Sequence, residues 1–238
     1  MTPLLYALVA AAANLAGGLA VTRSAKRGLK VIEGFVAFGA GYMLAIALAE
    51  LVPNALELGG PEAPMFVLLG YLLVHLSQHT LTQHFHFGEE THRVPHSAGT
   101  SALVGLLLHT FFDGVAIASG FLVSPELGLL IFIAIFLHKL PEGVTISSIQ
   151  VAGGTSHRRA LASAGLLGLA TVIGVLATDY VHFLTVHGLA ISAGVTIYVG
   201  ASNLVPEFQG KPGWRLPVAF FIGAATFFGT RELVHGIL

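Results

Sequence analysis

Long apolar runs separated by short polar segments dominate the hydropathy pattern of this chain. A helix that crosses the hydrocarbon core of a bilayer needs about 20 predominantly apolar residues. The runs predict eight such helices, over Leu4–Thr22, Val31–Asn54, Ala63–Gln83, Thr100–Val123, Pro125–Val151, Arg159–Tyr180, Val186–Phe208 and Trp214–Leu233. The pattern therefore predicts an all-α polytopic membrane protein in which residues 1–238 form one transmembrane domain.

The composition agrees with a membrane protein and excludes several kinds of functional site. Of the 238 residues, 55% are hydrophobic and only 10% are charged, whereas a soluble domain is about 25% charged. The chain has no cysteine, which excludes a disulfide framework, a thiolate metal site and a cysteine nucleophile. It also has no Walker motif, so ATP does not drive any activity from this chain. No nucleic-acid partner is expected.

The basic residues fall in alternate loops between the predicted helices. They are Arg23, Lys26, Arg27, Lys30, Arg93, Arg158, Arg159, Lys211 and Arg215. Because cytoplasmic loops of membrane proteins carry an excess of Lys and Arg, these loops are expected to face the cytoplasm, which puts both termini outside. The lack of targeting signals favours a prokaryotic inner membrane.

Two five-residue segments echo each other. Residues 50–54 read Glu-Leu-Val-Pro-Asn and residues 203–207 read Asn-Leu-Val-Pro-Glu, in helices that are predicted to run in opposite directions. Such an echo favours an inverted repeat of the first three and last three helices, an arrangement common in transporters. Glu50 and Glu207 either guide cations at the two ends of a pathway or are interfacial carboxylates satisfied by water or a helix terminus.

The fourth and fifth predicted helices carry the strongest candidate site. His109 precedes Asp113 by four residues, and His138 precedes Glu142 by four, so each pair shares a helix face. Both pairs lie about 20 Å from the short link at Ser124, at similar depth in antiparallel neighbours. One alternative is that each histidine only pairs with the carboxylate of its own helix and so lowers the cost of burying it. The other is that the two pairs form one site. Imidazole and carboxylate ligands suit Zn²⁺ and other divalent first-row metals, so we expect a metal site.

Histidines also gather in the predicted cytoplasmic loop of about residues 84–99. They are His84, His86, His92 and His96. Histidine-rich tracts can bind metal, so the loop is expected to receive or sense metal ions in the cytoplasm. The alternative is a flexible polar linker.

The segments His109–Gly114 and His138–Gly143 resemble the signature helices of the ZIP (Zrt/Irt-like) family of divalent-metal transporters. Residues 49–53 and 198–207 resemble the family's second and seventh helices. The resemblance implies eight helices arranged 3+2+3 with a transport site near the midplane, and it places Glu207 beside the pathway. It also implies inward transport of divalent metal by alternating access, with Zn²⁺ expected first and Fe²⁺, Mn²⁺, Co²⁺ or Cd²⁺ left open.

No prosthetic group is implied, and the expected partners are the bilayer and the metal ion, with homodimerisation left open. The alternative function is an intramembrane zinc-dependent hydrolase, in which His and Asp hold a metal and a carboxylate activates water. Against it, the sequence contains no His-Glu-x-x-His motif.

The chain departs from the family pattern at Thr110 and Lys139. Many family members hold two adjacent metals and can use a carboxylate on the sixth helix. Here that helix offers Thr171 and Thr178, with Asp179 at its end. One hypothesis is that the Lys139 ammonium takes the place of the second cation, which makes the site mononuclear. The other is that Lys139 points away and pairs with Glu207 or Glu50.

Overall fold

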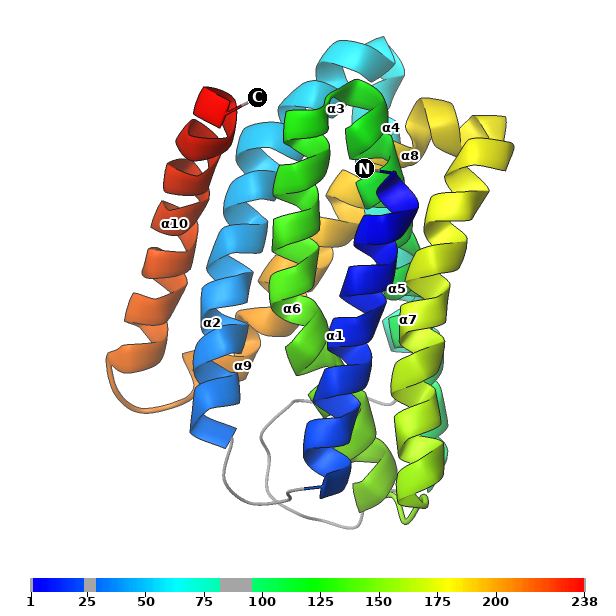
Figure 1. Ribbon diagram of the computed structural model, residues 1–238, viewed down its shortest axis with the longest axis vertical. Coiled ribbons are helices and arrows are strands. Elements are labelled where there is room, and N and C mark those ends of the chain that lie inside the picture. Colours follow the sequence, from blue (N-terminus) through cyan, green and yellow to red (C-terminus); the bar gives the residue numbers. More distant parts are fainter. Residues whose placement is uncertain (1, 24–28, 82–95, 238) are drawn as a thin grey trace.

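The computed structural model describes residues 2–23, 29–81 and 96–237, and all regular structure in those ranges is helical (Figure 1). The α-helices are α1 (Pro3–Arg23), α2 (Leu29–Ile46), α3 (Val52–Gly59), α4 (Ala63–Leu81), α5 (His96–Val123), α6 (Pro125–Ala152), α7 (His157–Tyr180), α8 (His182–Tyr198), α9 (Pro206–Gln209) and α10 (Arg215–Ile237). A 3₁₀ turn, Gly60–Glu62, links α3 to α4. The prediction of an all-α fold is thus confirmed.

Six stretches of the described chain are long and apolar enough to cross a membrane. They are Pro3–Thr22, Glu33–Gln78, Ala102–Val123, Pro125–Ala152, His157–Tyr180 and His182–Leu204. The second has 46 residues, and the chain reverses within it at Gly60, whose φ of 60° suits glycine. It therefore supplies two crossing segments. The 23-residue helix α10 is not among the six, since charged residues near its ends dilute its hydropathy.

The α5–α6 hairpin places the two predicted His/carboxylate motifs side by side. Ser124, in extended conformation, accepts a hydrogen bond from the backbone N–H of Leu127 at 3.1 Å, and Pro125 is the first residue of α6. A serine N-cap followed by proline at the first helical position is a strong helix start. This cap fixes where α6 begins, and it thereby sets the depth of the residues that follow.

Glycines let neighbouring helices approach closely in pairs. A Cβ added at Gly143 of α6 would overlap the carbonyl oxygen of Asn14 in α1, and one added at Gly114 of α5 would overlap that of Thr171 in α7. Such contacts explain how α1, α5, α6 and α7 pack as one four-helix group around the two motifs. Small residues at helix contacts are the usual device in lipid, where van der Waals packing must hold helices together.

Four of the remaining helices, α2, α4, α8 and α10, pack through glycines in the same way. Gly41 of α2 and Gly223 of α10 each meet the backbone of the other helix, at Phe220 and Phe38 respectively. Helices α4 and α8 are paired in the same way, through glycines on both. These pairs flank the four-helix group, and α8 is tied to α5 by a buried hydrogen bond from Ser192 Oγ to the carbonyl of Phe112 at 3.1 Å.

Two π-helical segments, which the sequence did not reveal, each end at the leucine of a Leu-Val-Pro sequence. They are Ala47–Leu51, between α2 and α3, and Val199–Leu204, between α8 and α9. In each, proline follows within two residues, at Pro53 and Pro206. Proline lacks an N–H and disrupts the hydrogen bonds of the preceding turn, and π segments inside helices often accompany functional sites.

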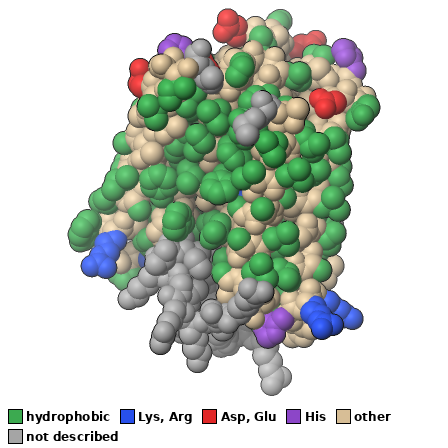
Figure 2. Space-filling model, in the orientation of Figure 1, with side chains coloured by type: hydrophobic (Ala, Val, Ile, Leu, Met, Phe, Trp, Pro, Cys, Tyr) green, Lys and Arg blue, Asp and Glu red, His purple; other side chains and the backbone are tan. Residues whose placement is uncertain are grey.

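Charge separates along the long axis of the molecule. The two termini lie at the same end in Figure 1, and Figure 2 shows acidic side chains gathered at that end and basic ones at the opposite end of this face. Hydrophobic side chains cover the region between in Figure 2. Many large apolar residues of the described chain are exposed, among them Leu8 and Phe221. That band is what a bilayer requires of a protein surface.

We expect Gly41→Ala to lower the free energy of unfolding by about 1–3 kcal/mol, the usual cost of overpacking. The new methyl group would overlap the backbone carbonyl of Phe220, so α2 and α10 must move apart. Unfolding of the purified protein in detergent measures the change. Gly229→Ala is the matched control, because nothing lies within 4 Å of the Cβ it adds; an equal loss in both variants would contradict the close-packing argument.

Candidate metal centre

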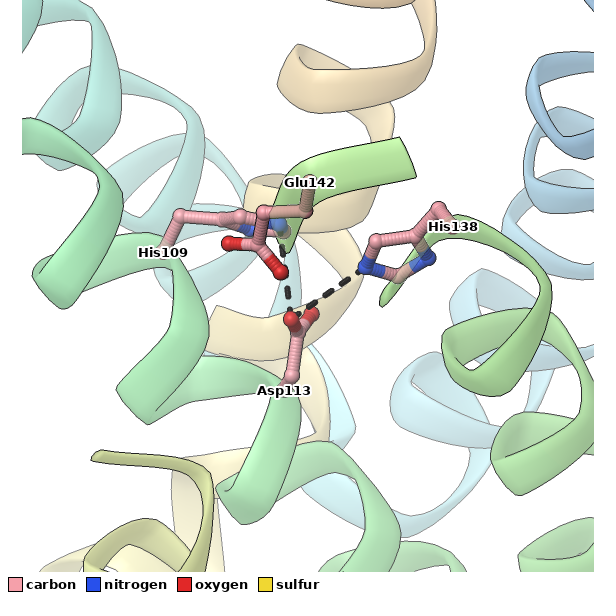
Figure 3. Close-up of side chains that lie close together, drawn as sticks. All are labelled: His109, Asp113, His138 and Glu142. Atoms are coloured by element: carbon pink, nitrogen blue, oxygen red, sulfur yellow. Dashed lines mark hydrogen bonds and ion pairs between the residues drawn. The ribbon is translucent and has the colours of Figure 1, made fainter. Parts of the chain in front are cut away.

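The four predicted ligands converge between α5 and α6 (Figure 3). His109, Asp113, His138 and Glu142 each offer a ligand atom, and these atoms all lie within 4.8 Å of one another. All four side chains are buried. The sequence prediction that the two motifs form one cluster is confirmed as geometry; that the cluster binds metal stays a prediction.

Asp113 is the centre of the cluster. Its Oδ2 lies 3.4 Å from His109 Nε2 and 3.3 Å from His138 Nε2. The expected pairing within each motif therefore holds for His109 and Asp113, whereas the described ion pair of His138 crosses from α6 to α5. This cross-helix contact joins the two motifs through a single carboxylate.

The second nitrogen of His138 fixes how its ring is oriented. Nδ1 lies 3.0 Å from the carbonyl oxygen of Ala134, and because a carbonyl can only accept, Nδ1 carries the proton. Nε2 faces Asp113 Oδ2 at 3.3 Å. A doubly protonated ring would donate to that carboxylate from Nε2, whereas a neutral ring would present the Nε2 lone pair to a metal ion. Metal-binding histidines almost always donate their other N–H in this way, which sets the tautomer and raises ligand basicity. Among the described residues, His109 Nδ1 has no hydrogen-bond partner.

Lys139 lies within the cluster. Its Nζ donates to Asp113 Oδ2 at 2.6 Å and to Glu142 Oε2 at 2.7 Å, and the side chain is completely buried. The alternative in which Lys139 points away and pairs with Glu50 or Glu207 is therefore wrong. Lys139 and Glu142 are three residues apart on α6, so they share one face of the helix. If Lys139 turned away from the two carboxylates, its ammonium would be buried without a partner.

Thr110 supplies a contact that the sequence did not assign. Its Oγ1 lies 2.7 Å from Glu142 Oε1 and 2.6 Å from the carbonyl of Leu106. A hydroxyl has one proton, so it donates to one of these oxygens at a time. Together with Lys139, it leaves both Glu142 oxygens partnered. The threonine that departs from the family pattern thus positions a candidate ligand.

The arrangement can chelate a metal after a small contraction. Two imidazoles and two carboxylates give the nitrogen and oxygen ligands that zinc accepts at about 2.0–2.2 Å, which places tetrahedral ligand atoms roughly 3.4 Å apart. The present separations reach 4.8 Å. With neutral histidines, the two carboxylates and one ammonium leave the buried cluster with a net negative charge, which favours a cation over an anion or a neutral molecule.

The other predicted site residues lie away from this centre. Glu50 pairs with Arg231 Nε at 2.6 Å, and its carboxylate accepts from Asn54 Nδ2 at 3.2 Å. His84, His86 and His92 lie outside the described residues, as do the side chains of His96 and Glu207. Thr171 and Thr178 on α7 are buried and bond to carbonyls of their own helix.

Sequence reasoning missed one buried amide beside the site. Asn14 of α1 is fully buried against Gly143, the residue after Glu142. Neither of its amide atoms has a hydrogen-bond partner among the described residues. The available signal was an asparagine in the middle of an otherwise apolar predicted helix, since such a polar group is expensive in a membrane unless it has a role.

An apolar helical bundle around a buried His/carboxylate cluster with a net negative charge is typical of an integral membrane protein that handles cations. Comparison with known proteins identifies the family. The model of the ZIP zinc transporter family matches residues 96–230, more than half of the chain. The chain therefore belongs to the ZIP zinc transporter family, which confirms the resemblance of the two motifs.

Individual relatives agree. The chain is 30% identical over 224 residues to the zinc transporter ZupT of Salmonella newport (strain SL254), covering 86% of this chain and 85% of that one. It is 29% identical over 224 residues to ZupT of Escherichia fergusonii, with the same coverage. It is 28% identical over 143 residues to zinc transporter ZIP10 of Danio rerio, covering 56% of this chain but only 17% of ZIP10.

Membership of this family places the chain among transporters of divalent metal and not among enzymes. The alternative of an intramembrane zinc hydrolase gains no support from the comparisons.

Proposed function

We propose that the chain carries Zn²⁺ into the cytoplasm by alternating access, through a single-metal site made by His109, Asp113, His138 and Glu142. The observation that carries the proposal is the convergence of four buried donor groups within 4.8 Å on two adjacent helices. Ionisable groups at membrane depth are costly and mark ion pathways in transporters. The relatives with similar coverage are zinc transporters, which supports zinc over other divalent metals.

The full proposed architecture has eight crossings arranged 3+2+3. In it, α5 and α6 are the central pair, and α10 is the eighth crossing. The matched π segments Ala47–Leu51 and Val199–Leu204, each followed directly by Val-Pro, support an inverted repeat. Inverted repeats allow two related halves to open the same site to opposite sides in turn.

The proposed orientation puts both termini outside, in a bacterial inner membrane. Arg158, Arg159, Lys211 and Arg215 belong to the end opposite the termini. Since basic loops remain cytoplasmic, metal would enter from the acidic end and leave at the basic end. On this orientation Glu50 attracts metal in the outer half, competing with its partner Arg231, and Glu207 guides metal at the inner end. The loop histidines His84, His86, His92 and His96 would receive it.

Lys139 supports one metal per site. Its ammonium binds one oxygen of each carboxylate at 2.6 and 2.7 Å, as a second cation would. One Zn²⁺ then takes the cluster from a net charge of −1 to +1, whereas a second would crowd three positive centres into a buried volume. Anomalous scattering from metal-soaked crystals tests this directly: two metals about 4 Å apart, the spacing of two-metal sites, would refute it.

Flux into proteoliposomes tests the function. We expect zinc-loaded buffer to give protein-dependent uptake, reported by a zinc-sensitive dye sealed inside, that saturates with zinc concentration and requires no ATP. Competition by Fe²⁺, Mn²⁺, Co²⁺ or Cd²⁺ in the same assay ranks the metals. Uptake no faster than that of protein-free liposomes, with the protein shown to be folded and inserted, would overturn the proposal.

A further inference from the structure

A cavity lies at the end of the molecule that holds the termini, apart from the metal centre. It has a volume of about 630 Å³ and is lined by residues of α1, α5, α6 and α7, among them Tyr6, Phe121, Leu122, Leu129 and Asp179. In Figure 1 the first turn of α1 lies beside the last turns of α7 and below the α5–α6 turn. The volume is within the range of about 300–1,000 Å³ that ligand sites occupy.

The wall of this cavity is largely aromatic and aliphatic. The rings of Tyr6 and Phe121 stack with centroids 4.8 Å apart and an angle of 22° between their planes, and Tyr6 also contacts Phe132 at 4.8 Å. Leu122 is 57% exposed, so the cavity is continuous with the apolar surface that faces lipid. An occupant with an apolar portion can therefore enter from the membrane.

One ionised group lines the same cavity. Asp179 is exposed, one residue before the end of α7. The cavity also includes the first residues of α1 and α6, Pro3 and Pro125. We expect these helix ends to lie at the boundary between hydrocarbon and head groups, because the apolar stretches Pro3–Thr22 and Pro125–Ala152 begin there. Stacked aromatic rings with a nearby carboxylate are the combination that attracts organic ammonium groups.

The charge around the cavity determines which lipid head groups can bind there. The acidic residues near this end of the described chain are Glu50, Glu57, Glu62, Glu126, Asp179 and Glu232. Arg231 is paired with Glu50, and His235 lies 3.1 Å from Glu126. Carboxylates still outnumber cationic side chains at this end, so an anionic head group would be repelled. A zwitterionic head group that ends in an ammonium would instead present its cation to the carboxylate.

We propose that this cavity is a binding site for an ammonium-bearing phospholipid of the outer leaflet, with the ammonium against Asp179 and the aromatic rings and an acyl chain along Leu122 and Leu129. The bound lipid would bridge α1, α5, α6 and α7, the helices that pack around the metal centre. The inference does not depend on which metal is transported or on transport itself; only the assignment to the outer leaflet rests on the proposed orientation.

Native mass spectrometry of the delipidated full chain tests the site. Dioleoyl phosphatidylethanolamine, dioleoyl phosphatidylcholine and dioleoyl phosphatidylglycerol compete in one mixture. We expect the two ammonium-bearing lipids to be retained about fivefold more than phosphatidylglycerol, and Asp179→Asn to abolish that preference. Glu232→Gln is the matched control, an exposed carboxylate of α10 outside the cavity, and it should keep the preference.

A second pair of variants tests whether lipid retention depends on the cavity itself and not only on the charge of Asp179. Leu122→Trp fills the cavity from an exposed position and should reduce specific retention of both ammonium lipids, whereas Leu8→Trp, at a similarly exposed position of α1 outside the cavity, should not. Equal retention of all three lipids by the unmodified protein, a preference for phosphatidylglycerol, or a preference that survives both Asp179→Asn and Leu122→Trp would overturn the proposal.

Discussion

Replacing both cluster histidines, His109→Ala with His138→Ala, is expected to lower zinc uptake by at least about a hundredfold. The two imidazoles are the nitrogen donors of the cluster, and each approaches Asp113 Oδ2 within 3.4 Å. Loss of even an outer-shell partner costs 10–100-fold in metal affinity, so loss of two direct ligands should cost no less. Zinc flux into proteoliposomes and calorimetric zinc titration of the purified protein measure the two effects.

The double variant should still fold, which keeps the result interpretable. Lys139 continues to pair with both carboxylates after the imidazoles are gone, so no charge is left unpartnered. His182→Ala with His235→Ala is the matched control, because both histidines are exposed and belong to helix ends at the end of the molecule that holds the termini. Uptake at the unmodified rate after loss of His109 and His138, in correctly inserted protein, would show that zinc passes elsewhere.

The metal cluster could be predicted because local rules fix its geometry. A spacing of four residues puts His109 beside Asp113 on one helix face, and the Ser124 cap with Pro125 sets the register between α5 and α6. Two helices joined by so short a link must be antiparallel neighbours. Few degrees of freedom then remain, so depth counted along the sequence was enough to bring the motifs together.

The partner of Lys139 could not be predicted in the same way. A lysine has a flexible four-carbon stem, which reaches several groups from one backbone position. The sequence therefore left two destinations open, and the choice depended on tertiary packing, because Glu50 is already paired with Arg231. The cross-helix contact of His138 with Asp113 and the bond of Thr110 to Glu142 were missed for the same reason.

Hydropathy could not predict the two π-helical segments. The predicted ranges Val31–Asn54 and Val186–Phe208 each treat as one regular helix what the structure divides by a π segment. Hydropathy averages over a window and does not respond to a change in hydrogen-bond pattern. The Leu-Val-Pro echo was the signal that marked both places, although its consequence for the backbone was not evident from residue types alone.

Lys139→Met is expected to destabilise the zinc-free protein by about 3–5 kcal/mol, because it leaves Asp113 and Glu142 buried without their ammonium partner. Zinc should restore most of that loss, since a ligand at about 100 times its dissociation constant adds about 2.7 kcal/mol. Thermal unfolding with and without zinc measures the change. Lys211→Met is the control: its pair with Glu33 at 2.8 Å is about one-third exposed, so its removal should cost about 1 kcal/mol or less.

The same variant should also change how many metals bind. With the ammonium gone, the two carboxylates are free to share a second cation, so elemental analysis should find two zinc ions per Lys139→Met chain against one in the unmodified protein. Lys139→Arg, which keeps a cation between Asp113 and Glu142, should stay at one. A single zinc in all three proteins would mean that the geometry of α5 and α6, and not the charge of Lys139, limits the site to one metal. Two in the unmodified protein would show that the ammonium moves aside when metal binds.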